Sequence, residues 1–291
     1  MRRRLLRKIF PKNDFGDLAY ATCVFVMKHG RLPEKPPSRF NDHLYTIRKK
    51  GDLCDPLVQF CTDKELVKKH ITSTVGCEYV VPTFDILQNK TELLEYFPDK
   101  TPCVFKPTQS SGQVVVCKQK LSTFERRTML KWFGLNHYLV SRENNYRNLA
   151  KKIIVEKFIS TDGKSVPHDY KVYCFHGIPR VIHVDAGRFS EHTRNFYDTS
   201  WQRLAIEHSK YPNSVDDNPF PLSLLDQMLS VAEKLAKPFR FVRVDFYLTD
   251  RVYVGELTFL PDAGFEPLKP MTAEYLLGSY FEDYGENVER V

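Results

Sequence analysis

The chain has 291 residues, 42% of them hydrophobic and 27% charged, which is typical of a globular protein with room for about two domains. The net charge of +7 is uneven: residues 1–50 hold 13 Lys and Arg against 4 Asp and Glu, an excess of +9, and the remainder is at −2. The apolar run 18–27 is too short to span a bilayer, and no nucleic-acid motif is present. The basic N-terminus therefore suits an anionic lipid or an acidic glycan, or it is simply a solvated face.

The cysteines and the N-terminus predict a cytoplasmic protein. There is no C-x-x-C pair and no zinc spacing, so we expect reduced thiols. "MRRRLLRKIF" is followed by "PKNDFGD" and not by a small-residue cleavage site, which argues against a signal peptide. Peripheral contact of the basic segment with the inner face of the membrane stays open.

Residues 1–77 are predicted to form a basic, mainly helical region. A helix is expected over 17–29, and the proline-rich stretch 31–42 reads as an extended connector. The segment 55–76 contains a helix in which Asp63 is a plausible N-cap and Gly76 a plausible stop.

The rest of the chain alternates strands and helices in a pattern that predicts an α+β fold. Strands are expected at 78–87, on both sides of a polar turn within 102–119, and at 152–159, 169–177, 178–185 and 194–198. Helical segments are expected at 90–97, 122–152 and 216–239, and the strand hairpin 243–259 follows them.

The hairpin "RVDFYLTDRVYVGELTF" carries two acids inside apolar runs. With Asp250 and Arg251 at the tip, Asp245 faces Glu256 and Arg243 faces Thr258. Like charges that face each other need compensation, which Mg²⁺ would supply through the oxygen ligands that it prefers. The alternative is a shifted register in which one acid pairs with a nearby arginine.

Three further apolar strands carry charged residues. Lys106 ends "CVFK" directly before a Ser/Gly/Gln turn, where a lysine and the backbone amides of 109–113 can reach phosphate oxygens. Glu156 lies in "VEKFI", and Asp169 and Lys171 share one face of "DYKVYCF". Taken singly, each is weak evidence because charged residues are common at strand ends, and Lys106 alone is better explained as a surface lysine at a hairpin edge.

In this order the motifs resemble the ATP-grasp superfamily and, within it, the teichuronopeptide-biosynthesis (TupA-like) family of bacterial surface-polysaccharide gene clusters. The resemblance runs from about 36 to 267. It is carried by "FNDHLY", "DPLVQFCTDKELVKKHI", "FKPTQSSGQ", "VEKFI", "DYKVYCFHGIPRVIHVDAGRF", "TRNFYD", "FVRVDFY" and "GELTFLPDAGFE".

The resemblance implies an ATP site and assigns a role to each matching residue. Lys106 would contact phosphate and adenine, and Glu156 would lie near the adenine amino group. Lys171 would reach the γ-phosphate. Further contacts are implied for the lid loop 109–113 with Ser110, Ser111 and Gly112, for the backbone of Lys157 and Ile159, and for Asp162 at the ribose.

The same resemblance implies a metal and a transfer site. Asp245 and Glu256 would bind Mg²⁺, for which Mn²⁺ can substitute, and Arg243 would stabilise the transferring phosphoryl group. Thr258 stands where many members have Asn, so one or two ions stay open. Arg188 and Arg194 are our candidates for binding a substrate carboxylate, against a surface loop with salt bridges as the alternative.

The implied fold is an ATP-grasp fold, in which two α+β subdomains with antiparallel sheets sandwich ATP. Residues 78–159 would form the lid subdomain and 160–291 the catalytic, metal-binding subdomain, with a short helical region in place of the usual N-terminal α/β domain. The implied activity is carboxylate–amine ligation through an acyl phosphate, joining an amino acid or amine to a uronic acid in capsule biosynthesis. Alternatives are a kinase on the same fold, a glycosyltransferase and a non-catalytic nucleotide-binding module.

Overall fold

A computed structural model describes residues 2–161, 167–187, 191–215 and 222–283. Its helices are α1 (Arg2–Ile9), α2 (Asp14–His29), α3 (Phe40–Lys50), α4 (Pro56–Thr62), α5 (Leu66–Thr74), α6 (Lys90–Glu95), α7 (Thr123–Trp132), α8 (His137–Ser141), α9 (Leu225–Ala236) and α10 (Met271–Ser279). Its strands are β1 (Thr83–Leu87), β2 (Cys103–Pro107), β3 (Val115–Cys117), β4 (Ile153–Lys157), β5 (Asp169–Phe175), β6 (Ile178–Ala186), β7 (Thr193–Asp198), β8 (Arg203–Leu204), β9 (Glu207–His208), β10 (Phe241–Leu248), β11 (Val252–Thr258) and β12 (Leu268–Lys269).

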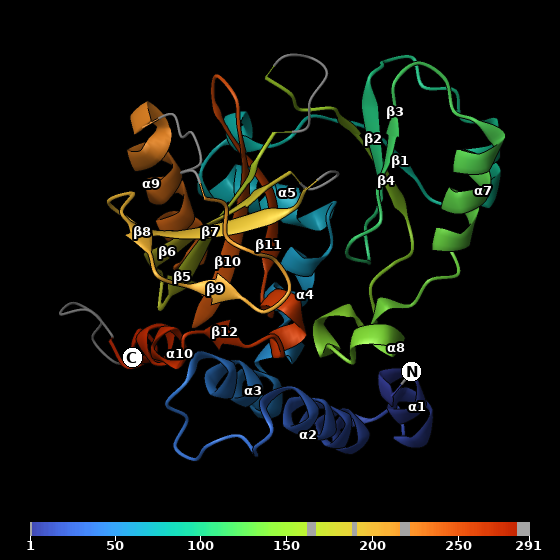
Figure 1. The fold of residues 1–291 in the computed structure, drawn as a ribbon. Coiled ribbons are helices and arrows are strands. Elements are labelled where there is room, and N and C mark those ends of the chain that lie inside the picture. Colours follow the sequence, from blue (N-terminus) through green and yellow to red (C-terminus); the bar gives the residue numbers. More distant parts are fainter. Residues whose placement is uncertain (1, 162–166, 188–190, 216–221, 284–291) are drawn as a thin grey trace.

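The smaller of the two main sheets has the strand order β1-β4-β2-β3, and all of its pairs are antiparallel. Helices α6 and α7 cover its outer side (Figure 1). Leu93 of α6 and Met129 and Trp132 of α7 pack on strand residues such as Phe105 and Val155, which are fully buried. Burial of these apolar side chains joins the sheet and its helices into one layer pair.

The larger sheet has the order β11-β10-β5-β6-β7-β8 and is also antiparallel. Helix α9 covers one face of it (Figure 1), where Met228, Ala232 and Leu235 are fully buried against Val172 and Val244. Because side chains alternate across a strand, the residues between these apolar ones point to the opposite face.

That opposite face, here called the polar face, carries the unusual charges. Two rows cross the sheet on it: Glu256, Asp245, Lys171 and His183 are consecutive cross-strand partners, as are Tyr247, Asp169, Asp185 and Arg194. A third row aligns Thr258, Arg243 and Tyr173. The acids therefore sit in strands because these strands have one apolar face and one face built for a site.

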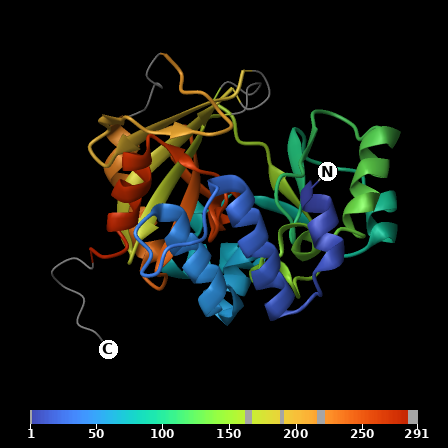
Figure 2. The ribbon, with the colours of Figure 1, turned by 60° about the horizontal axis from the view of Figure 1, so that its bottom comes forward.

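The N-terminal helices lie along the lower edge of both sheets. Helices α2 and α3 run beneath the larger sheet beside α10, and α1 lies under α8 (Figures 1 and 2). The helix predicted over 17–29 is confirmed as α2, which begins at an N-cap, Asn13, that accepts a hydrogen bond from the Gly16 amide and ends at left-handed Gly30.

The helix expected within 55–76 is confirmed as α5, which the Asp63 carboxylate caps by accepting from the Leu66 amide at 3.1 Å, whereas α4, which precedes it, was not predicted. Two predicted boundaries were wrong. The first strand begins at Thr83, after a short 3₁₀ turn. The helical pattern of 122–152 ends at Ser141, because Arg142 takes a left-handed conformation with φ of 56°. Within the predicted 216–239 helix, residues 216–221 lie outside the described residues.

Candidate active site

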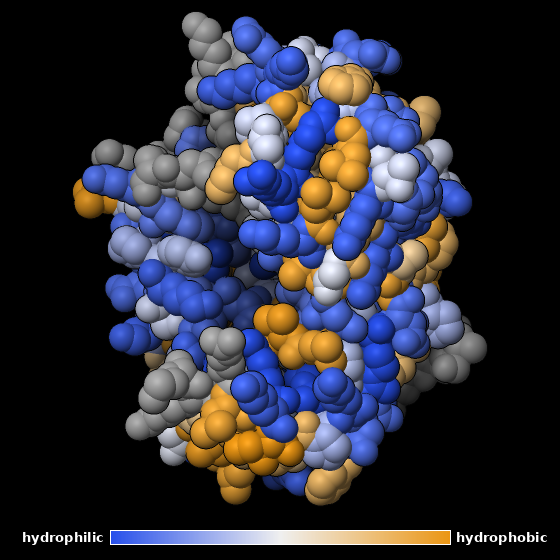
Figure 3. Space-filling model, turned by 90° about the vertical axis from the view of Figure 1, so that its right-hand side faces the viewer, coloured by the Kyte–Doolittle hydropathy of each residue, from blue (hydrophilic) through white to orange (hydrophobic). Residues whose placement is uncertain are grey.

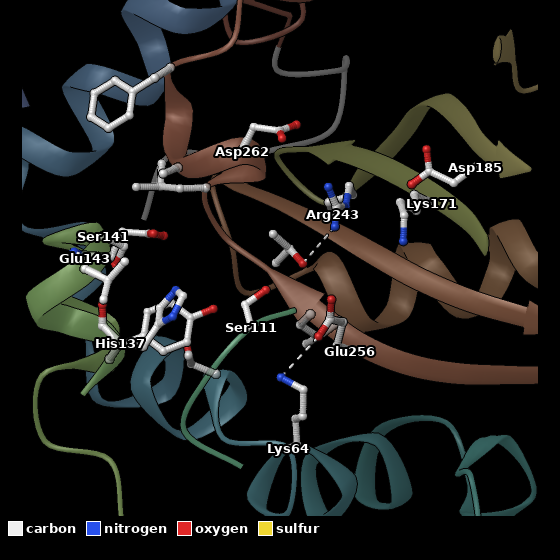
Figure 4. A pocket seen from close by; sticks show the side chains of 18 of the residues that line it. Lys64, Ser111, His137, Ser141, Glu143, Lys171, Asp185, Arg243, Glu256 and Asp262 are labelled. Carbon is white, nitrogen blue, oxygen red and sulfur yellow. Dashed lines mark hydrogen bonds and ion pairs between the residues drawn. The ribbon is translucent and has the colours of Figure 1, made fainter. Parts of the chain in front are cut away.

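Two cavities lie between the sheets and meet above the polar face. The narrow cavity, of about 120 Å³, opens between the small sheet and the β10–β11 hairpin. The wide cavity, of about 510 Å³, continues toward α1 and α8. Lys64, Ser111, Lys171 and Glu256 line both. A recess lined by hydrophilic side chains is visible in Figure 3, in which the right-hand side of Figure 1 faces the viewer, and Figure 4 shows residues of the wide cavity.

The narrow cavity has apolar walls and polar groups at its ends. Its apolar side chains include Val81, Val104, Val116, Phe158 and Ile159. Lys106 and Tyr247 line it too, with the Lys106 ammonium 5.6 Å from the Tyr247 ring centroid. A slot of this kind suits a flat heterocycle whose charged part lies toward the wide cavity.

Glu156 is held between two lysines. Its carboxylate lies 2.8 Å from Nζ of Lys106 and 2.5 Å from Nζ of Lys68. Burial raises the pKa of Glu156, but the two ammonium groups outweigh burial and lower it to about 2. Glu156 lines neither the narrow nor the wide cavity, and its carboxylate instead holds Lys106 at the wall of the narrow one. The sequence did not single out Lys68.

Asp245 binds two cations of the polar face. Its Oδ1 accepts from Nε of Arg243 at 2.6 Å, and its Oδ2 accepts from Lys171 at 2.8 Å. Burial lowers the pKa of Lys171, but Asp169 and Asp245 outweigh it and raise the pKa above its usual value. Arg243 also donates to the Thr258 hydroxyl at 3.2 Å, drawn as a dashed line in Figure 4. Asp245, Arg243, Lys171 and Thr258 are thus brought together as predicted.

Glu256 faces Lys64, which sequence reasoning missed. The Lys64 ammonium lies 3.4 Å from the Glu256 carboxylate (Figure 4). It also donates to the Ser110 carbonyl at 2.6 Å. Burial raises the pKa of Glu256, and Lys64 with Lys171 and Arg243 lowers it to about 2. Lys64 lies between two short helices in "TDKEL", where no local pattern separates it from a surface lysine.

The loop after β2 covers the junction of the cavities. Ser111 lines both cavities, and Gly112, with φ of 86°, lines the narrow one together with Lys157. Ser110 lines neither of these two cavities, and its hydroxyl donates at 2.6 Å to Gln113, which lines the narrow one.

Arg194 reaches the wide cavity while paired to two acids. Its Nε donates to Asp185 at 2.7 Å, and a terminal nitrogen lies 3.3 Å from Asp262. Asp262 has φ of 49° and also contacts His208 at 3.2 Å. Asp185 and Asp262 were not singled out as site residues, although "DYKVYCFHGIPRVIHVDAGRF" contains the first and "FLPDAGFE" the second. The predicted residues Asp162 and Arg188 lie outside the described residues.

Glu143 is a further missed group on the far side of the wide cavity. It lies across from Glu256 and Arg243, beside Ser141 and His137 (Figure 4). The residue is 5% exposed, and burial raises its pKa to about 7 although Arg48 acts in the opposite direction. A polar, unremarkable stretch, "SRENNY", gave no signal for it.

The residues fit a divalent cation of the Mg²⁺ type. Asp245 and Glu256 are direct cross-strand partners, and the Thr258 hydroxyl lies on the same face. Carboxylate and hydroxyl oxygens are the hard donors that Mg²⁺ takes. The Lys64, Lys171 and Arg243 contacts place positive charge beside the two acids.

Two antiparallel sheets that enclose a slot, with Lys106 on the smaller sheet and paired acids on the hairpin of the larger one, define the chain as an ATP-grasp protein. The model of the TupA-like ATP-grasp family matches residues 45–282, and the chain belongs to this family. The predicted family and α+β fold class are thereby confirmed.

Several solved structures resemble this chain over more than two thirds of its length, at low sequence identity. The D-alanine–D-alanine ligase from Bacillus anthracis complexed with ATP is 18% identical over 69% of this chain and 56% of that one, with a TM-score of 0.38. The VanG D-Ala:D-Ser ligase from Enterococcus faecalis is 13% identical over 77% and 61%, with a TM-score of 0.42. An ADP complex of N5-carboxyaminoimidazole ribonucleotide synthetase is 15% identical over 70% and 46%, with a TM-score of 0.43.

This chain spans less than two thirds of the length of each of these three chains. A sequence comparison with curated proteins found no match.

Proposed function

We propose that the protein is an ATP-dependent ligase that joins a carboxylate to an amine and releases ADP and phosphate. One observation carries the proposal: a narrow apolar slot and a wide polar cavity meet at Lys171, Glu256 and Lys64. A nucleotide in the slot would present its terminal phosphate to a second substrate in the wide cavity.

In this proposal each part of the slot has a role. Lys106 binds nucleotide phosphate and is held in place by Glu156, while Lys157 and Ile159 contact the base. The loop 109–113, with Ser111 and Gly112 on the lining, covers the phosphates and excludes water from the acyl phosphate. Residues 78–159 then act as the lid and 160–291 as the catalytic and metal-binding part.

Asp245 and Glu256, with Thr258 beside them, would hold Mg²⁺. The ion would neutralise phosphate charge. Lys171 and Arg243 lie against the same acids and would contact the transferring phosphoryl group, where positive charge is needed as the bond to ADP breaks.

The bonds change in two steps. An oxygen of the substrate carboxylate attacks the γ-phosphorus, the bond from this phosphorus to the bridging oxygen breaks, and ADP leaves with the electron pair. The amine nitrogen then attacks the acyl carbon, and phosphate leaves as the amide forms. The nitrogen must lose a proton, and Glu143, which lines the wide cavity with a pKa of about 7, is the base that we assign.

The proposed substrates are a uronic acid of a bacterial surface polysaccharide and an amino acid or amine. The support is the cationic lining of the wide cavity, which includes Arg194 and Arg243.

No helix in the described ranges is long and apolar enough to cross a membrane. Apolar side chains gather at the bottom of the face in Figure 3, where the N-terminal helices lie, and Leu5 and Ile9 of α1 are exposed, which supports a peripheral contact with a membrane or a lipid-linked glycan.

The test is ADP release with Mg²⁺ across uronic acids, amino acids and pairs of these, with and without hydroxylamine. A ligase forms a hydroxamate with the correct acid, because hydroxylamine traps the acyl phosphate. A stable phosphoester would instead identify a kinase, and no stimulation of ADP release by any pair would overturn the proposal.

A further inference from the structure

The N-terminal helix α1 forms one wall of the wide cavity. Arg3 and Arg7 line this cavity, and they lie one helical turn apart on the same side of α1. Leu6 and Phe10 pack on the small core of α2, whereas Lys8 is exposed. Residues 1–44, which include this wall, precede the part of the chain that matches the family model.

Arg3 and Arg7 are the cations of the wide cavity whose charge is least compensated. Lys64, Lys171, Arg194 and Arg243 each lie within 3.4 Å of a carboxylate. Arg7 has no carboxylate partner in the described part of the chain and only a 3.4 Å hydrogen bond from its Nε to the Tyr20 hydroxyl.

Arg3 shares its carboxylate partner, Glu266, with two lysines. Its contact with Glu266 is long, at 3.8 Å, and Lys28 and Lys210 bind the same carboxylate at 2.8 and 3.1 Å. One terminal nitrogen of Arg3 has no hydrogen-bond partner in the described residues. Partly enclosed guanidinium donors without partners attract an anion, because each unmade hydrogen bond costs free energy.

A buried network fixes α1 against the cavity. Arg142, whose residue is 1% exposed, donates to the carbonyls of Arg7 at 2.8 Å, Phe10 at 2.9 Å and Pro11 at 2.8 Å, and it pairs with Asp17 at 2.8 Å. These bonds hold the last turn of α1 by its backbone. The side chain of Arg7 is therefore presented by a fixed support and not by a loose arm.

We propose that Arg3 and Arg7 form an anion-binding subsite at the end of the wide cavity, and that the acceptor carries a second negative group besides the carboxylate that reacts. The inference rests on the proposed function, which places the reacting carboxylate near Lys171 and Arg243. The substrate class is then a polyanion, such as an acidic oligosaccharide with one charge per sugar unit, and not a single uronic acid.

The test uses calorimetric titration of the full chain saturated with Mg²⁺ and ADP. The probes are mono-, di- and trigalacturonate, which differ in the number of carboxylates but share one chemistry. We expect the wild type to bind digalacturonate at least about 10-fold more tightly than galacturonate, as expected for one added charged hydrogen-bonded contact. The double variant R3Q/R7Q should lose this difference while keeping its affinity for galacturonate.

The matched control is K8Q/K12Q, which removes the same charge from exposed positions outside the wide cavity and should bind as the wild type does. Equal thermal unfolding of R3Q/R7Q and the wild type checks the fold, since the Arg142 bonds use backbone atoms of Arg7. If R3Q/R7Q binds every probe as the wild type does, including no binding by either, the subsite is wrong. Failure of the wild type to bind ADP would instead overturn the proposed function.

Discussion

Asp245 and Glu256 face each other across β10 and β11 because the hairpin contains a β-bulge at Gly255. Near the tip, Tyr247 pairs with Tyr253, whereas Asp245 pairs with Glu256 on the other side of the bulge. One extra residue in β11 thus moves the second acid onto the face of the first. The sequence-based register was correct at the acids and one residue out nearer the turn.

Replacement of Asp245 with Asn should abolish most of the activity. The variant loses a proposed metal ligand, so we expect ADP release to fall by at least about 100-fold. It also leaves Lys171 and Arg243 with reduced compensation, which should lower the free energy of unfolding by about 3 kcal/mol. Turnover assays and urea denaturation measure the two effects. Asp250→Asn at the exposed hairpin tip is the control, and an active D245N would contradict the metal assignment.

Gly255→Ala should disturb both the bulge and the nucleotide slot. A Cβ atom at this position would lie 2.9 Å from Cε2 of the Tyr247 ring, which lines the slot. We expect unfolding to become easier by about 1–3 kcal/mol and the Kd for ATP to rise. Gly134→Ala, where the closest atom to the new Cβ would be at 3.4 Å, should change neither value. Unchanged ATP binding by G255A would contradict the expectation that the bulge positions Tyr247 for the nucleotide slot.

The Glu156 carboxylate should make the protein sensitive to acid. Its folded-state pKa of about 2 lies below the ordinary value of 4.5, so its contribution to stability is present above pH 4.5 and is lost as the pH falls toward 2. The shift corresponds to up to about 3 kcal/mol. Urea denaturation at several pH values should therefore show a smaller loss over this range in Glu156→Gln than in the wild type. Parallel curves would refute the depressed pKa.

Glu143 should act in the opposite sense. Its pKa of about 7 is above the ordinary 4.5, so its contribution to stability is full below pH 4.5 and is lost as the pH rises through 7. Glu143→Gln should consequently lose less stability between pH 4.5 and 8 than the wild type, by up to about 3 kcal/mol.

If Glu143 is also the base, E143Q should be slow at all pH values and lack the rise of the rate near pH 7. Exposed Glu95→Gln serves as the control for both measurements. If E143Q shows the same pH–rate behaviour as the wild type, Glu143 is not the base.

The sequence by itself determined most of the local elements and the charged pairs of the hairpin. Alternation along 169–177 and in the hairpin 243–259 predicted strands, Asp169 and Lys171 were placed on one face, and Asp245 was paired with Glu256 by counting alone. Such residues are predictable because side-chain direction in a strand has a fixed period, and because a hairpin brings its two strands together over a short distance in the chain.

Only the tertiary structure decided which distant charges meet. Lys64 reaches Glu256 across 192 positions of the chain, and Glu143, Arg3 and Arg7 close the wide cavity from segments whose local pattern is that of an ordinary polar surface. The Gly255 bulge was also invisible to counting. Burial and long-range packing set these contacts and shift the pKa values of Glu143 and Glu256 in opposite directions, because one acid is buried with weak compensation and the other among several cations.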